Sequence, residues 1–152
     1  MTEHHAGAAR EHPSRPASGD STCGTADGTV SRQAPGTEVK ALLIPAEGPP
    51  REVGLADGGG TRFMRSLRTL IGARCVEWIC ITDRWEAWLD EDGAAAGKPV
   101  NQAATLLARS FGWQLSLLGA TVIAGPDKDA DSPAGLSHDQ VRAILRRITG
   151  TP

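Results

Sequence analysis

Large aliphatic and aromatic side chains are almost absent from the first 38 residues of this chain and become frequent from Val39 onward. Before that point the sequence consists mainly of Gly, Ala, Ser, Thr, Pro and scattered charges, and Val30 is almost alone as a large aliphatic residue. Such a segment cannot bury enough apolar surface to offset the entropy lost on ordering. We therefore expect a disordered tail over residues 1–38 and a compact domain that begins at Val39.

Composition excludes several classes of protein. The chain of 152 residues has a formal net charge of −2 and a pI near 6.1, so no overall field draws it to nucleic acid or to an anionic membrane. The sequence shows neither the pattern of a secretion signal nor a long apolar run, so we expect neither a leader nor a membrane span, and its three cysteines make no even disulfide framework. We expect a cytoplasmic protein without a membrane partner. The tail histidines His4, His5 and His12 are expected to be solvated rather than to bind a metal.

Hydrophobic periodicity from Val39 onward alternates between the two-residue period of strands and the spacing of amphipathic helices. A continuous apolar run on both faces at 73–82 predicts a central strand, and residues 113–118 are ambiguous between strand and helix. The other predicted elements are strands at 39–46, 51–55, 84–93 and 120–126 and helices at 61–72, 101–112 and 137–149.

This order predicts the α+β class: a mostly antiparallel sheet of about five strands covered by two or three helices, with the strand order left open. The compact domain is expected over 39–126 and a polar linker over 127–136. A capping box at Ser137 and Gln140 starts the last helix, over 137–149, and its apolar spacing predicts that it docks on the domain. Thr61 is the expected N-cap of the first helix.

Asn101 stands between a Pro-Val pair and the helical pattern AATLLARSFG. An asparagine there can accept a hydrogen bond from a backbone N–H of Ala103 or Ala104, which is the geometry of an N-cap. We interpret Asn101 as a cap, and its replacement by alanine would cost about 1 kcal/mol.

Several short patterns occur together in order: KALLIPAEGPPREV, LRTLIGARCVEWICI, WLDEDG, GKPVNQAATLL, LLGATVIAG and GLSHDQVRAIL. With these patterns, the chain resembles the family catalogued as domain of unknown function 3846 over roughly residues 39–148. The resemblance implies an origin in bacteria or their phages and implies no biochemical activity. The positions that match the family pattern are Glu77, Glu91, Gly93, Pro99, Asn101, Ala104 and Gly119.

No catalytic set is apparent in the sequence. Asp90, Glu91 and Asp92 could hold a divalent cation if they converged, but two carboxylates before a glycine are also typical of a solvated turn. His138 is the only histidine outside the tail, and Cys75 and Cys80 are expected to be small core residues. We therefore predict no catalytic, cofactor-binding or metal-binding residues and a protein that is not an enzyme; metal-assisted hydrolysis remains a third hypothesis.

Two groups of side chains could bind a macromolecule. The first is a set of arginines on the first and last helices, which would form a phosphate-binding patch if the two helices adjoined: Arg62, Arg65, Arg68, Arg142, Arg146 and Arg147. The second is the pair Trp85 and Trp88, which occupy odd and even positions of one strand, so one of them is expected to be exposed and to contact a partner.

These observations favour a non-enzymatic protein-interaction or accessory module of phage or mobile-element type, with an unknown protein as partner. The alternative is a nucleic-acid-binding module that uses the arginine-rich helix faces. The sequence does not decide the oligomeric state.

Overall fold

The computed structural model describes residues 38–56, 60–126 and 134–150. It has five strands and three helices, named in chain order: β1 (Glu38–Ile44), β2 (Arg51–Ala56), α1 (Gly60–Ile71), β3 (Val76–Cys80), β4 (Glu86–Asp90), α2 (Gln102–Arg109), β5 (Thr121–Ala124) and α3 (His138–Thr149). The predicted tail, apart from Glu38, and residues 127–133 of the predicted linker lie outside the described residues.

The five strands form one antiparallel sheet in the order β2-β1-β5-β4-β3, which confirms the predicted α+β class. Two hairpins, β1-β2 and β3-β4, form the two halves of the sheet. Strand β5 enters last along the chain and pairs with β1 on one side and β4 on the other. The outer strands are therefore β2 and β3, so the prediction that the segment around β3 is central is wrong.

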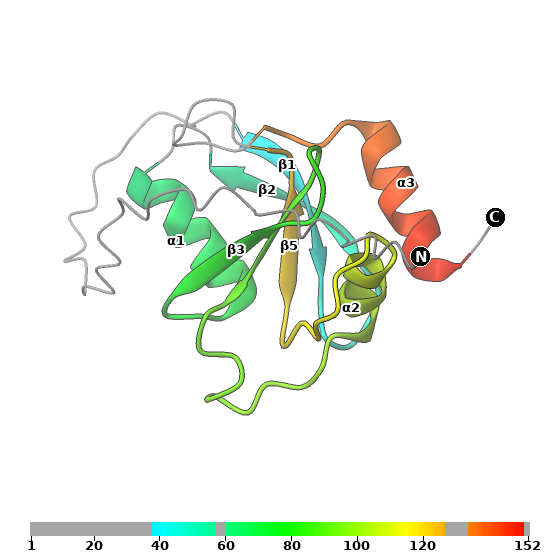
Figure 1. Ribbon diagram of the computed structural model, residues 1–152. Coiled ribbons are helices and arrows are strands. Elements are labelled where there is room, and N and C mark those ends of the chain that lie inside the picture. The colour runs from blue at the N-terminus through cyan, green and yellow to red at the C-terminus, as the bar shows by residue number, and fades with distance from the viewer. Residues whose placement is uncertain (1–37, 57–59, 127–133, 151–152) are drawn as a thin grey trace, which may run out of the picture.

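Helices cover both faces of this sheet (Figure 1). Helix α1 buries Phe63, Leu67 and Ile71 against one face, and α2 and α3 pack against the other. Successive residues of a strand point to opposite faces, so central strands must be apolar on both. Strand β1 fits this rule, because all four residues from Ala41 to Ile44 are buried.

The boundaries of the helices follow from their caps. Helix α3 starts at the predicted capping box of Ser137 and Gln140, and it docks through Val141 and Ile144. Helix α1 ends before Gly72, whose φ of 69° is a left-handed conformation that glycine adopts without strain. Thr61 is not the N-cap of α1, because the helix already includes Gly60.

Residues 113–118 form no regular strand or helix, although Leu118 makes an isolated bridge to Val100. Within the described ranges, none of the helices has the length and apolar character needed to cross a membrane.

Candidate functional site at the edge of the sheet

Asn101 is completely buried, and both its side-chain oxygen and its side-chain nitrogen are hydrogen-bonded. Its Oδ1 accepts from the backbone N–H of Ala104 at 3.0 Å, so the predicted N-cap is confirmed. Its Nδ2 donates to the carbonyl of Ile44 at 2.8 Å and to that of Gly119 at 2.9 Å. The residue therefore fastens α2 to the end of β1 and to the segment before β5, which the sequence did not indicate.

The carboxylates of the hydrolase hypothesis do not converge. Asp90 is buried, its Oδ2 lies 2.7 Å from the Lys98 ammonium, and its Oδ1 accepts from the backbone N–H of Asp92. The same ammonium donates to the carbonyl of Gly72 at 2.9 Å, at the C-terminal end of α1. Glu91 is exposed, and the described part of the chain contains no group of three His, Cys, Asp or Glu residues arranged to hold a metal. Asp90 and Lys98 thus link β4 to α1.

Cys80 carries a free thiol at the end of β3. Burial raises the pKa of this thiol, and the carboxylates of Glu86 and Asp83 raise it further. Its Sγ donates to the carbonyl of Thr82 at 3.0 Å, so the thiol stays protonated and is a weak nucleophile. Both Cys75 and Cys80 are half-buried, which corrects the prediction that they are core residues.

The six arginines do not form one patch. Helix α1 and helix α3 lie on opposite faces of the sheet, so the condition for a joint phosphate-binding surface is not met (Figure 1). Arg147 is engaged with an aromatic ring, because its guanidinium lies 4.4 Å from the ring centroid of Phe111. The two arginine sets therefore remain on separate surfaces: Arg62, Arg65 and Arg68 on α1, and Arg142, Arg146 and Arg147 on α3.

The expectation that Trp85 or Trp88 is the exposed tryptophan is not met. The two rings do point to opposite sides of the sheet, as their spacing predicts, but helices cover both sides. Trp85 is buried, with its ring centroid 5.3 Å from that of Phe111. Trp88 is half-buried beneath α1, 5.4 Å from the ring centroid of Phe63.

The exposed tryptophan is Trp78, with 42% of its surface accessible. It lies in β3 directly opposite Trp88, and the two ring centroids are 6.3 Å apart. Phe63, Trp88 and Trp78 thus form a row of aromatic rings that runs from the core beneath α1 to the edge of the sheet. The contact with Trp88 covers part of the Trp78 ring, and the rest of the ring is exposed to solvent.

The backbone of β3 also presents hydrogen-bonding groups at this edge. Glu91 donates its N–H to the carbonyl of Cys75, and Ile81 donates to that of Trp85, so the hydrogen-bonded pairs with β4 fall on the odd positions of β3. The even positions must therefore turn their N–H and C=O groups away from β4. They are Val76, Trp78 and Cys80.

Glu77 adds negative charge beside Trp78. Its side chain is exposed on the sheet face opposite to that of Trp78. Partial burial raises the pKa of this carboxyl, and the charges of Glu91 and Asp90 raise it further. Asp90 is already paired with Lys98, whereas Glu77 and Glu91 are exposed to solvent at this end of β3.

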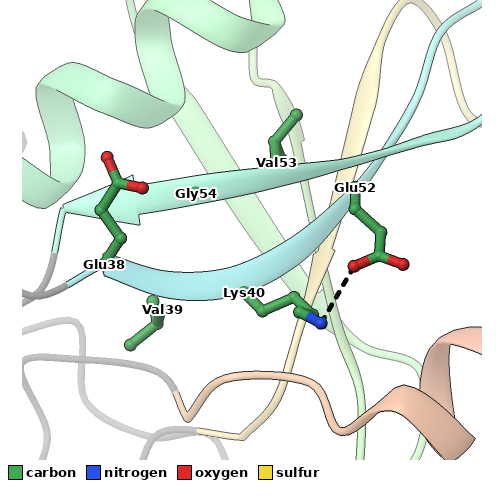
Figure 2. A pocket seen from close by; sticks show the side chains of 6 residues that line it. All are labelled: Glu38, Val39, Lys40, Glu52, Val53 and Gly54. Atoms are coloured by element: carbon green, nitrogen blue, oxygen red, sulfur yellow. Dashed lines mark ion pairs between the residues drawn. The ribbon is translucent and has the colours of Figure 1, made fainter.

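The opposite edge of the sheet, at β2, is covered by charges and by α1. Lys40 and Glu52 form an ion pair of 3.1 Å across the strands, and Glu38 lies over Gly54 (Figure 2). Together with Val39 and Val53 these residues line an open depression of about 320 Å³. The ammonium and one of its carboxylates already satisfy each other, so this depression has little chemistry to offer a ligand.

The comparisons with known proteins identify the family. Residues 39–149 match the family described as Domain of unknown function (DUF3846). The chain belongs to this family. No curated protein and no solved structure matches the chain. Of the positions that the resemblance singled out, Gly93 is buried, Gly119 accepts from Asn101, and Glu77 and Glu91 lie at the exposed β3 edge.

Sequence reasoning missed Trp78 because it treated the β3 segment as central. One signal was available: a charged glutamate in the middle of an apolar strand is a usual way to protect an edge from unwanted pairing. Glu77 therefore pointed to an edge strand, and an edge position would have left its neighbour Trp78 exposed.

Proposed function

We propose that this protein is a non-enzymatic interaction module that binds a partner protein through the β3 edge, defined here as Val76 to Cys80. The observation that carries the proposal is the exposure of Trp78 on an outer strand, with its ring held against Trp88. Tryptophan is enriched among the residues that dominate binding energies, because it buries a large surface and loses little conformational freedom.

In the described part of the chain, two other large apolar residues are exposed, Val100 at 48% and Leu106 at 54%. Both are aliphatic and neither lies on an outer strand, so they offer apolar area without backbone hydrogen-bonding groups. The β3 edge offers an aromatic ring and backbone groups together, which makes it the better candidate for a specific interface.

The phage or mobile-element setting of the proposal rests on the family, whose pattern implies bacterial or phage origin. A cytoplasmic location is part of the same proposal.

The proposal can be tested by placing a photo-crosslinking phenylalanine analogue at position 78 of the full chain, produced in cells of its natural source. Position 106 is the matched control, because Leu106 is also apolar and exposed. We expect one defined protein to be crosslinked from position 78 and not from position 106.

The crosslinked protein is then purified and its affinity for the wild type and for Trp78→Ala is measured. Loss of a tryptophan anchor is expected to weaken binding by at least about tenfold. The absence of a crosslinked protein, or equal affinity for wild type and variant, would contradict the proposal.

A further inference from the structure

The β3 edge combines three properties that suit it to bind another strand. It has outward backbone groups at Val76, Trp78 and Cys80, an exposed aromatic ring on one face and an exposed carboxylate, Glu77, on the other. Outward groups of an outer strand are a template for a further strand. Side chains that flank such a template select which strand can pair with it.

The two edges of the sheet differ in how far this template is covered. The carbonyl of Lys40 accepts from the N–H of Leu136, so the backbone groups of Lys40 point away from β2. Lys40 and Gly54 are therefore a non-hydrogen-bonded pair, and the backbone groups of Gly54 point outward at the β2 edge, as do those of every second residue of β2. At this β2 edge, the outward N–H of Ala56 lies 3.4 Å from Ser66 Oγ of α1. Among the described residues, no corresponding cap is present on Val76, Trp78 or Cys80.

We propose that the β3 edge takes up an extended segment of the partner protein as a sixth, antiparallel strand, with a lysine or arginine opposite Glu77 and an apolar residue opposite Trp78. This inference rests on the proposed function and names the chemistry of the partner segment.

The negative charge of Glu77 favours a partner segment that carries a lysine or arginine. Glu77 does not form a hydrogen-bonded pair with the added strand, because its backbone groups are used by β4. Residues that face each other in such non-hydrogen-bonded pairs have their side chains closest together. A cation opposite Glu77 therefore lies near its carboxylate.

A second copy of this chain fits the edge less well. It would bring its own Glu77 and Glu91 to a surface that already carries these two carboxylates, and like charges in close cross-strand positions are destabilising. A separate partner can supply the missing positive charge.

The side chains of Trp78 and Ile79 favour apolar residues at the facing positions of the added strand. Trp78 leaves 42% of its surface uncovered on the α1 side, and Ile79 is half-buried on the other side. Apolar residues of the added strand opposite these two positions would extend both hydrophobic layers to the new edge. The expected partner segment therefore has apolar residues opposite Trp78 and Ile79 and a basic residue opposite Glu77.

The probe for this inference is the peptide acetyl-Ser-Thr-Val-Leu-Lys-Thr-Ser-amide, titrated into the isotope-labelled full chain and followed by NMR. In the proposed register its leucine lies opposite Trp78 and its lysine opposite Glu77. The leucine N–H then points into the new ladder and the lysine N–H points away. Methylation of the leucine nitrogen is expected to weaken binding at least about tenfold, and methylation of the lysine nitrogen less than about threefold.

The charge preference is tested with a second peptide in which glutamate replaces the lysine. The wild type is expected to prefer the lysine peptide by about fivefold or more, and Glu77→Lys is expected to reverse this preference. Glu47→Lys introduces the same charge change in the turn between β1 and β2, and it should keep the wild-type preference.

Strand addition is overturned if neither peptide binds, if both methylated peptides bind like the parent, or if the charge preference is the same in Glu77→Lys. It is also overturned if sedimentation shows a dimer whose interface protects the β3 edge. A partner whose affinity depends on Trp78 but is unchanged in Glu77→Lys and involves no paired strand would overturn this inference and leave the proposed function standing.

Discussion

Asn101 and Trp78 differ in what surrounds them, because the structure satisfies the hydrogen-bonding groups of the first side chain and leaves the second partly exposed. The sequence predicted that Asn101 caps a helix but not that its amide also donates two hydrogen bonds, and it missed the exposure of Trp78. Around Asn101 the amide oxygen and nitrogen find partners within the chain, from α2, β1 and the segment before β5. At the β3 edge the ring of Trp78 is partly exposed, and among the described residues the outward backbone groups beside it have no partner.

The difference separates residues that build the fold from residues that are available to something else. A buried polar side chain with satisfied partners is explained by the fold, since leaving its partners unpaired would be costly. An exposed tryptophan on an outer strand is not explained by the fold. Substitutions at Asn101 should therefore change stability, and substitutions at the β3 edge should chiefly change binding.

The largest loss of stability is expected for Asn101→Ala. The change removes the cap of α2, worth about 1 kcal/mol, and removes the hydrogen bonds donated to the buried carbonyls of Ile44 and Gly119, at about 1 kcal/mol each. We expect the free energy of unfolding to fall by about 3 kcal/mol, measured by urea denaturation.

Two variants sharpen this first prediction. Asn101→Asp keeps the capping oxygen but cannot donate to the two carbonyls, so it should be destabilised at least as much as the alanine variant. Gln102→Ala alters the exposed neighbour and should change stability by less than about 0.5 kcal/mol. If Asn101→Asp is as stable as the wild type, the two bonds that Asn101 donates contribute nothing to stability. The contrast between Asn101 as a residue that builds the fold and Trp78 as a residue available for binding would then be wrong.

A smaller loss is expected for Lys98→Met. The substitution leaves the carboxylate of Asp90 buried without its 2.7 Å partner and removes the donor to the carbonyl of Gly72. Because Lys98 is partly accessible to solvent, water can replace part of the interaction, and we expect a loss of about 2 kcal/mol. Lys40→Met breaks an ion pair between exposed side chains and is the control, with an expected loss below about 1 kcal/mol.

Trp78→Ala is expected to lower the free energy of unfolding by only about 1 kcal/mol, because the ring is partly exposed and its main described contact is Trp88. Trp88→Ala should cost about 3 kcal/mol, since this ring also packs on Phe63. Thermal denaturation of the two variants measures the difference. Equal losses would mean that Trp78 is a structural residue.

The fold was predictable to the extent that local patterns determine it. Helix spacing gave the positions of α1 and α3 to within a residue, and the predicted caps Asn101 and Ser137 are present, whereas α2 ends three residues before the predicted end and Thr61 is not a cap. The strand order was not predictable, because it depends on long-range pairing: β5, the last strand in the chain, lies between β1 and β4.

The candidate site was less predictable for the same reason. Whether a strand tryptophan is buried depends on which strand is outermost and on which faces the helices cover, and neither is a local property. Trp85 and Trp88 are separated by the sheet, as their spacing requires, yet helices shield both of them. The arginines of α1 and α3 were likewise on the predicted helices, but the sheet separates them.

The smallest expected change in the free energy of unfolding is that caused by replacing Glu77. Its pKa is raised above the ordinary value of 4.5, so the folded state binds a proton more readily than the unfolded state does, and stability falls as pH rises through the interval between the two values. Glu77→Gln removes this charge and should be slightly more stable than the wild type at pH 7. The difference should vanish at about pH 3, well below the ordinary value of 4.5, because the carboxyl is then protonated in both the folded and the unfolded state.

Urea midpoints at the two pH values measure this effect, and Glu47→Gln serves as the control at an exposed site away from β3. A Glu77→Gln variant less stable than the wild type at pH 7 would show that the carboxylate is stabilised at the edge, contrary to the direction of its pKa.

The most direct test of an open β3 edge is amide hydrogen exchange in the free, full-length protein. The amides of Trp78 and Cys80 should exchange at least about tenfold faster than those of Glu77 and Ile79, because only the latter two donate into β4. Equal protection of all four amides would show that the edge is already occupied, and the account of a strand left open for a partner would be wrong.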